Sequence, residues 1–495
     1  MIFYWFLLLI VGLFTYLIVQ RSVAGITRTP VWLLWLVLMT PALLCNVWTV
    51  IYGTKQLPPL AVVFGVSVFC LYLYSVLFQW GRRESNSPDS AQTQAPAPES
   101  KPAVDTTREP LPLRPIAQSE ENQLRSCFPW TVYYIHNIEY RPQAVICRGQ
   151  LKTTPAVAYQ RIQKNIEAQF GDRFLVVFQE GLNGKPFFAL VPNPQSRASQ
   201  RSTEPLTRPI LALGLLATTL LTTSIVGLEF AGVNIAELES NPAVLVNGLP
   251  YALALITILG IHELCHYLTA RFYKIRSTLP YFIPFPFFLG TFGAFIQMRS
   301  PVPDRKALFD VSIAGPLSGF VATLPLLIWG LAHSTVVPLP AQPATLNPDA
   351  LNPSSSILLA LLSKLVLGSA LTATSAIDLH PVAVAGFLGL VVTALNLMPV
   401  GQLDGGHIVH AMFGQRIGAV IGQIARLLLL GIALVQPAFL LWAIILFFMP
   451  INDQPALNDV TELDNGRDIW GLLALGLLVI IILPVPNVIS QFLQI

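Results

Sequence analysis

The stretch ILGIHELCHYLTARF, residues Ile258–Phe272, places two histidines and a glutamate at the end of a long apolar run. The run starts near residue 244 and exceeds the roughly 20 residues that a helix needs to cross a bilayer. Ionisable side chains inside hydrocarbon are costly, so they usually mark a functional site. His262, Glu263 and His266 are therefore the first candidates for such a site.

Composition indicates an integral membrane protein. Of the 495 residues, 54% are hydrophobic and only 11% are charged, whereas soluble proteins carry about 25% charged residues. The formal net charge of +3 is too small to indicate a nucleic-acid partner, and none is expected. The five cysteines have no CxxC spacing, so a disulfide framework is not expected either.

The first 80 residues predict a membrane region of three spanning helices, at Ile2–Gln20, Val31–Tyr52 and Leu60–Trp80. The first segment has neither a basic start nor a small-residue cleavage site, which favours a retained helix over a signal peptide. Residues 81–117 are rich in proline and serine and predict a disordered linker.

Residues 118–196 predict a small α+β domain in the order ββαββ. The segments TVYYIHNIEY and QAVICRGQL are rich in β-branched and aromatic residues, as strands are. A helix is expected between Thr154 as N-cap and Gly171. Nothing in the domain looks catalytic, and it is a possible docking site for a partner protein.

Residues 197–495 are predicted to form the membrane-embedded core. The predicted fold class of the whole chain is therefore an all-α polytopic membrane protein of about 8–9 spans with a small α+β domain. Basic residues flank the spans on the side of the α+β domain, which predicts that this domain faces the cytoplasm. The candidate spans are Ile210–Leu228, Val244–Phe272, Leu308–Leu331, Val382–Pro399, Ile417–Phe448 (one long or two short) and Ile469–Pro484.

His262-Glu263-Leu264-Cys265-His266 is an HExxH motif. On a helix the two histidines lie one turn apart, so both imidazoles can reach one metal ion. Glu263 lies about 100° round the helix and can touch a water on the metal without being a ligand. The pattern predicts one Zn²⁺ per chain with Glu263 as the catalytic base. The alternative is three core residues satisfied by hydrogen bonds alone.

A catalytic zinc site takes three protein ligands and leaves one position open. The segment TALNLMPVGQLDGGHIVH supplies Asp404 as the favoured third ligand, with His407 and His410 as rivals. His407 is otherwise expected beside the ligands or at an interface. Pro399 should break the preceding helix, and Gly405 lets backbones approach closely.

Asn396 lies about one turn before Pro399. Its amide can hydrogen-bond a substrate carbonyl or a developing oxyanion, or it can hold two helices together.

These motifs together resemble the site-2 protease family of intramembrane zinc metalloproteases. HExxH in one span and Asn396-x-x-Pro399-x-x-x-x-Asp404-Gly405 in a later one carry the resemblance, and GTFGAFIQM and DVSIAGPLSGF are similar to stretches between them. The resemblance implies His262, His266 and Asp404 as ligands and Glu263 as base. RGQLK at Arg148–Lys152 and the three leading spans further resemble the cyanobacterial and chloroplast subgroup of ethylene-dependent gravitropism-deficient and yellow-green proteases, although that subgroup's GNLR motif differs here at two positions.

The segment YFIPFPFFLGTFGAFIQMRS is apolar but interrupted by prolines and by Gly290 and Gly293. We expect a re-entrant β-hairpin whose edge receives an extended substrate as an added strand, with both glycines near the substrate; the alternative is an aromatic loop lying on the surface. Ile357–Leu371 should not span fully, since the ligand-bearing segments on either side must run in compatible directions.

The function predicted is hydrolysis of peptide bonds within or near membrane-spanning segments of substrate proteins. A membrane metallopeptidase acting on soluble peptides and a non-catalytic metal-binding scaffold remain as alternatives. A metal transporter would show ionisable groups at several depths and internal repeats, and the sequence shows neither. The expected location is the plasma or thylakoid membrane of a cyanobacterial-like cell.

Overall fold

The computed structural model describes two compact units, Met1–Thr107 and Arg108–Ile495. Most of the predicted spans Ile2–Gln20 and Leu60–Trp80, and the predicted linker up to residue 114, lie outside the described residues. The described residues are 29–52, 115–181, 184–193, 208–235, 237–285, 289–338, 353–372, 375–435, 439–451 and 453–493, with a few single residues before 29 and between 66 and 77.

In the first unit, helix α2 spans Val31–Tyr52, which coincides with the second predicted span. Its Leu34 is fully buried and packs against Leu77. The indole N–H of Trp35 donates to the carbonyl of Gly12, which precedes α2 in the sequence, at 2.7 Å. Helix α2 therefore contacts residues from both of the segments that flank it.

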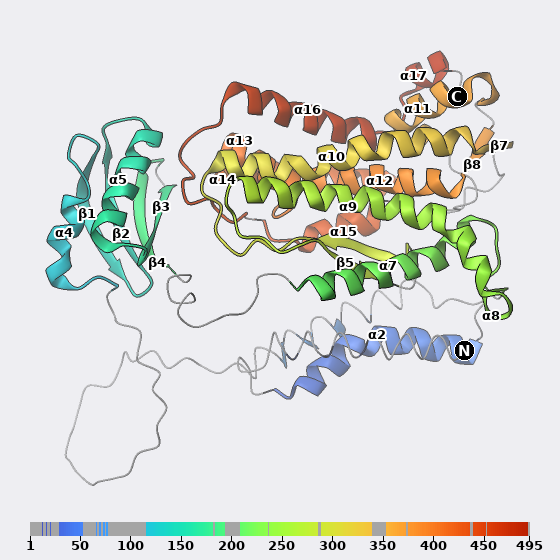
Figure 1. Ribbon diagram of the computed structural model, residues 1–495, viewed down its shortest axis with the longest axis horizontal. Helices are drawn as coiled ribbons and strands as arrows, with labels where there is room; N and C mark the ends of the chain where they lie inside the picture. The colour runs from blue at the N-terminus through green and yellow to red at the C-terminus, as the bar shows by residue number, and fades with distance from the viewer. Residues whose placement is uncertain are drawn as a thin grey trace, which may run out of the picture. The chain divides into compact units, whose positions relative to one another are not determined.

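The second unit begins with a 3-10 turn, η1 (Gln118–Glu120), helix α4 (Glu121–Ser126) and a four-stranded antiparallel sheet. Helix α5 (Pro155–Phe170) connects the second and third strands, so the predicted order ββαββ is the observed one (Figure 1). The spatial order is β1-β2-β4-β3, which leaves β3 at an edge. The strands are β1 (Tyr133–Arg141), β2 (Ala144–Leu151), β3 (Phe174–Glu180) and β4 (Pro186–Pro192).

Helix α5 begins and ends where the sequence predicts. Thr154 is the N-cap, proline follows at the first helical position, and Gly171 ends the helix at a φ of 61°. Its buried residues recur every three or four positions and face the sheet, where Phe178 and Phe188 stack at 4.1 Å. These buried helix residues are Ala158, Tyr159, Ile162 and Ile166.

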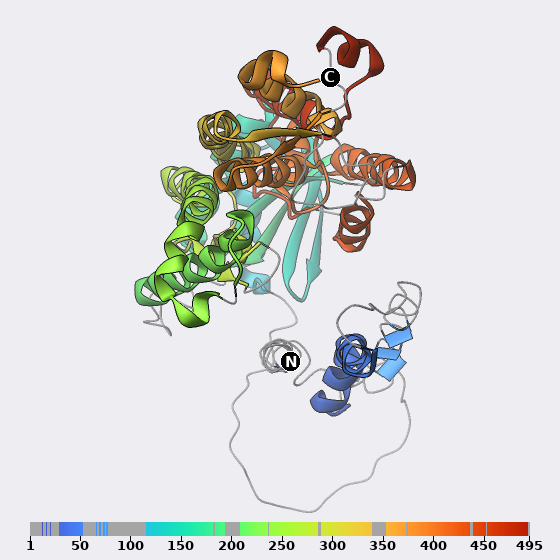
Figure 2. The ribbon, with the colours of Figure 1, turned by 90° about the vertical axis from the view of Figure 1, so that its right-hand side faces the viewer.

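The rest of the second unit is a bundle of helices, which Figure 2 shows end-on. Its helices are α7 (Pro209–Phe230), α8 (Glu237–Ser240), α9 (Leu249–Phe272), α10 (Arg305–Ala332), α11 (Ile357–Leu367), α12 (Pro381–Leu397), α13 (Asp404–Phe413), α14 (Gln415–Val435), α15 (Leu440–Phe448), α16 (Asn465–Ile482) and α17 (Asn487–Leu493), with 3-10 turns η2 (Pro242–Gly248), η3 (Pro353–Ser355) and η4 (Gly368–Ala370).

Five helical segments among the described residues are long and apolar enough to cross a membrane, so the predicted count of 8–9 spans is not confirmed. The predicted span Val382–Pro399 is the 17-residue helix α12, and the predicted span Ile417–Phe448 is divided between α14 and α15. The five are Pro209–Phe230, Pro242–Phe272, Arg305–Ala332, Gln415–Leu434 and Asn465–Ile482.

Two strand pairs and one short helix complete the bundle. Strands β5 (Tyr281–Pro284) and β6 (Thr291–Phe295) form the predicted antiparallel hairpin, and β7 (Thr335–Pro338) pairs with β8 (Ser375–Asp378). Helix α11 has 11 residues, well below the length that crosses a bilayer, as the sequence predicts for this segment.

Helices α9, α10 and α12 pack against one another at the centre of the bundle. Two glycines allow α10 and α12 to approach closely. A Cβ on Gly330 would lie 2.4 Å from the backbone nitrogen of Ala383, and a Cβ on Gly386 would lie 2.8 Å from the Cα of Leu327. Small residues at helix contacts are typical of membrane proteins, where close packing replaces the hydrophobic effect.

The segment between α15 and α16, residues 449–464, joins the bundle to the sheet domain; we call it the connector. The Leu457 N–H donates to the carbonyl of Val302 at 2.9 Å, and the Leu457 carbonyl accepts from the N–H of Phe178 at 2.6 Å. The Asp459 N–H returns to the Phe178 carbonyl at 2.9 Å. The connector therefore pairs with the exposed edge of the sheet, at strand β3.

Candidate metal centre

Three metal-ligating side chains converge between α9 and the start of α13. The Nε2 atoms of His262 and His266 lie 3.1 Å apart, and Asp404 Oδ2 lies 3.6 Å from the first and 3.3 Å from the second. One ligand atom from each residue falls within 4.8 Å of the others. Both histidines are buried. Two imidazoles and a carboxylate are a donor set that suits zinc.

Glu263 lies at the edge of this group. Its Oε1 is 4.0 Å from His262 Nε2, and its side chain is 13% exposed. The backbone of Ile296, the residue after β6, also faces this carboxylate. Glu263 thus lies between the three converging side chains and the end of the β-hairpin.

Helix α10 holds the two imidazoles in place. His266 donates from Nδ1 to the carbonyl of Val311 at 2.7 Å, which leaves Nε2 free to face Asp404. Gly315 and Gly319 lie directly against the rings. A Cβ on Gly315 would lie 2.0 Å from His266 Nε2, and a Cβ on Gly319 would lie 3.1 Å from His262 Nδ1.

The turn between α12 and α13 brings Asp404 to the histidines. Helix α12 ends at Leu397, two residues before Pro399, so the proline follows the helix rather than kinking it. A Cβ on Gly405 would lie 2.0 Å from the carbonyl oxygen of Leu397, and Gly401 has a φ of 54°, which favours glycine. Only a glycine-rich chain can place the first residue of α13 so close to the end of α12.

Asn396 also points into the group, because its Nδ2 lies 3.1 Å from His262 Nε2. The rival ligands His407 and His410 lie elsewhere. His407 Nδ1 is 2.8 Å from Asp453 Oδ2 in the connector, and His410 is bound on both sides by Asp453 and Asp459.

The connector carboxylates change the protonation of His410, which lies outside the five candidate spans. Burial lowers the pKa of its imidazole, but hydrogen bonds to Asp453 and Asp459 outweigh burial and raise the pKa to about 9. Burial likewise raises the pKa of Asp453, while hydrogen bonds with His407 and His410 bring it down to about 2. His410 therefore lies buried between two carboxylates that favour its protonated form.

Gly290 and Gly293 occupy two different settings. Gly290 packs on α7: its carbonyl accepts from Thr222 Oγ1 at 2.7 Å, and a Cβ there would lie 2.4 Å from the Cα of Thr223. Gly293 lies within β6 at a φ of 104°, and a Cβ would meet no atom within 4 Å. Gly290 thus anchors the hairpin on α7, whereas Gly293 leaves open space beside β6.

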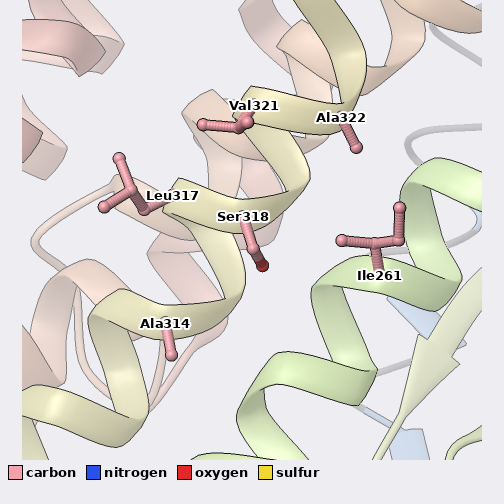
Figure 3. Close-up of a pocket in the computed structure, with 6 residues that line it drawn as sticks. All are labelled: Ile261, Ala314, Leu317, Ser318, Val321 and Ala322. Atoms are coloured by element: carbon pink, nitrogen blue, oxygen red, sulfur yellow. The ribbon is translucent and has the colours of Figure 1, made fainter.

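A cavity of about 440 Å³ lies between α9 and α10. Apart from Ser318, the side chains that line it are apolar (Figure 3). None of its lining residues is one of the three converging side chains, although Ile261 precedes His262. The hydroxyl of Ser318 already donates to the carbonyl of Gly315. The lining residues are Ile261, Ala314, Leu317, Ser318, Val321 and Ala322.

Sequence reasoning missed the residues that support the centre from other elements. The spacing Gly315-x-x-x-Gly319, typical of close helix contacts, was a signal for the α10 glycines. No pattern in the sequence linked Asp453 or Asp459 to His410, because their pairing depends on the path of the connector.

Two parts of the chain match known protein families. Residues 250–436, which contain the converging side chains, match the family model Peptidase family M50. Residues 122–198 match the model EGY3 middle domain. The part of the chain that matches the M50 model therefore follows the part that matches the EGY3 middle domain.

Among curated proteins, "Probable zinc metalloprotease EGY2, chloroplastic" of Oryza sativa subsp. indica is 31% identical over 370 residues, which cover 72% of this chain and 65% of the relative. "Probable zinc metalloprotease EGY1, chloroplastic" of Arabidopsis thaliana is 37% identical over 248 residues, or 48% of this chain and 43% of the relative. The chain therefore spans about two thirds or less of the length of these relatives.

Proposed function

We propose that this protein is a zinc-dependent intramembrane endopeptidase, which hydrolyses peptide bonds within or near the membrane-spanning segments of other proteins. The observation that carries the proposal is the convergence of His262, His266 and Asp404. Both histidines and Glu263 lie on α9, which is part of a helical segment long and apolar enough to cross a membrane. The family match and the names of the relatives support the same reading.

The donor set fits the metal that the family implies. Zinc in catalytic sites takes three protein ligands and keeps a fourth position for water or substrate. His262 Nε2, His266 Nε2 and Asp404 Oδ2 would hold it. Bound there, zinc would lower the pKa of a water molecule and polarise the carbonyl of the scissile bond.

Glu263 is then the proton carrier. Glu263 directly follows His262 on the helix, and its Oε1 lies 4.0 Å from His262 Nε2. Its carboxylate can therefore accept a proton from the attacking water. It returns the proton to the amide nitrogen as the peptide bond breaks. Asn396, which points at the same histidine, can donate to the oxygen that gains negative charge.

The β5–β6 hairpin offers a place for an extended substrate. Among the described strands, only β5 pairs with β6, so no described strand occupies the second edge of β6. The residue after this strand, Ile296, faces Glu263. A peptide added along β6 would therefore run toward the catalytic base, with its backbone unwound and accessible.

The depth of the site favours substrates inside the membrane over soluble peptides. His262 lies ten residues before the end of α9 at Phe272, about 15 Å at helical rise. We place the protein in a plasma or thylakoid membrane, in keeping with relatives named chloroplastic. The sheet domain, on the cytoplasmic side, is a candidate for docking partners.

Metal analysis of the full-length protein tests the proposal. Wild type should carry one zinc per chain, and His262→Ala and Asp404→Ala should each lose it, because two ligands do not hold the ion. Glu263→Gln should keep the metal but lose cleavage of a membrane-spanning reporter by more than about 100-fold. Wild type without zinc would refute the assignment, and wild type that binds zinc but does not cleave the reporter would favour a metal-binding scaffold. Full cleavage by Glu263→Gln would refute Glu263 as the base.

A further inference from the structure

Helix α13 carries Asp404 as its first residue and His410 less than two turns later. His410 is 1% exposed. Its Nδ1 lies 2.6 Å from Asp453 Oδ2, and its Nε2 lies 2.9 Å from Asp459 Oδ1. Both ring nitrogens are thus taken up by carboxylates of the connector, and charge-assisted hydrogen bonds of this kind are strong and directional.

Asp459 also touches the sheet domain. Its backbone N–H donates to the carbonyl of Phe178 in β3, at 2.9 Å. Phe178 is fully buried in the core of that domain, and Leu457 and Val460 of the connector pack against the same core. A single residue of the connector therefore binds the sheet domain through its backbone and α13 through its side chain.

Hydrogen bonds from Arg305 hold the C-terminal end of α13. The buried guanidinium of Arg305 donates to the carbonyls of Ala411 and Met412, at 2.7 and 2.9 Å. Arg305 follows Asp304, which pairs with Asn458 of the connector. Helix α13 is thus fixed on one side and at its end by groups that contact the connector, and its other end bears Asp404.

We propose that His410 is a positioning residue, which couples the sheet domain to the metal centre by fixing α13 and hence Asp404. The inference rests on the proposed function. A helix moves as a rigid rod over two turns, so a shift of the connector at Asp459 is passed to the carboxylate of Asp404. A partner that binds the sheet domain and displaces β3 would change metal affinity and cleavage in this way.

The size of the effect follows from how coordination depends on distance. A zinc–oxygen bond of about 2.0–2.2 Å does not tolerate a displacement of several tenths of an ångström. Residues that couple distant sites without touching the ligand typically change the equilibrium by about 2- to 30-fold. We expect effects of that size, smaller than the loss caused by removing a ligand.

The test is titration of the metal-free full-length protein with Co²⁺, whose visible absorption reports the geometry of its ligands. His410→Gln and Asp459→Asn should each weaken Co²⁺ binding by about 2- to 30-fold and alter the spectrum. The double variant should be no weaker than the weaker-binding single one, because both act through one contact. Leu457→Ala, which changes only packing on the sheet domain, should shift affinity in the same direction.

Asn165→Ala is the matched control, since it removes a hydrogen bond inside the sheet domain, to the carbonyl of Cys127, away from the connector. It should leave Co²⁺ binding unchanged. Folded His410, Asp459 and Leu457 variants with wild-type affinity and spectrum would overturn the coupling and leave the protease assignment intact. Wild type that binds no Co²⁺ would refute the proposed function, and the coupling with it.

Discussion

Replacing Gly315 by alanine should weaken metal binding although it leaves all three proposed ligands in the sequence. The new methyl carbon would lie 2.0 Å from His266 Nε2 and 2.4 Å from Cδ2, whereas ordinary contact begins at about 3.4 Å. The ring must therefore retreat by more than about 1 Å, while a zinc–nitrogen bond is only about 2.0–2.1 Å long. Because Val311 holds the other side of the ring, the imidazole has little room to retreat and stay bound.

We expect the metal affinity of Gly315→Ala to fall by at least about 10- to 100-fold, the range found when groups that orient metal ligands are lost. Overpacking should also cost about 1–3 kcal/mol of stability. The assay is zinc content of the purified protein beside cleavage of a membrane-spanning reporter. Gly319→Ala is the matched control: its Cβ would lie 3.1 Å from His262 Nδ1, so a shift of a few tenths of an ångström suffices. Wild-type zinc content in Gly315→Ala would refute the reasoning.

Three further changes test other contacts. Raising the pH should lower the free energy of unfolding by about 3 kcal/mol, because His410 loses a proton that it holds with a pKa of about 9 instead of 6.5. Since folding raises this pKa, the stabilisation by protonated His410 is complete below about pH 6.5 and is lost as the pH rises through about 9. Thermal unfolding should show this loss in wild type but not in His410→Gln. Arg305→Met should cost about 3 kcal/mol by leaving two carbonyls at the end of α13 unpaired, seen as a lower melting temperature in detergent; an unchanged one would contradict this. Thr222→Val, which frees the carbonyl of Gly290, should reduce cleavage several-fold at unchanged zinc content, and a loss of zinc instead would show that this contact supports the metal centre.

The elements with strong local signals could be predicted from the sequence. The HExxH spacing placed two histidines on one helix face, and apolar length predicted the helices around Ile258 and Leu308. Turn chemistry predicted α5, because Thr154, Pro155 and Gly171 act within one helical turn of its ends. The interrupted apolar stretch around Pro284 predicted a hairpin, since proline and glycine forbid a straight helix there.

Long-range contacts were beyond such reasoning. The convergence of Asp404 with the histidines followed from a requirement for a third ligand, and the structure brings them within 4.8 Å; that they bind zinc stays a prediction. His407 and His410 were rivals on residue type alone, and only the path of the connector gives them Asp453 as a partner. The predicted count of 8–9 spans is not confirmed, because only five helical segments among the described residues are long and apolar enough to cross a membrane, and α12 has 17 residues.

The three converging side chains come from widely separated parts of the chain, and this has a consequence for biosynthesis. His262 and His266 leave the ribosome long before Asp404 does, and α10, which orients their rings, is made between them. The nascent chain therefore has no complete set of the three side chains until α13 begins. Under the proposed function, a chain interrupted before α13 would lack Asp404 and with it a complete metal centre.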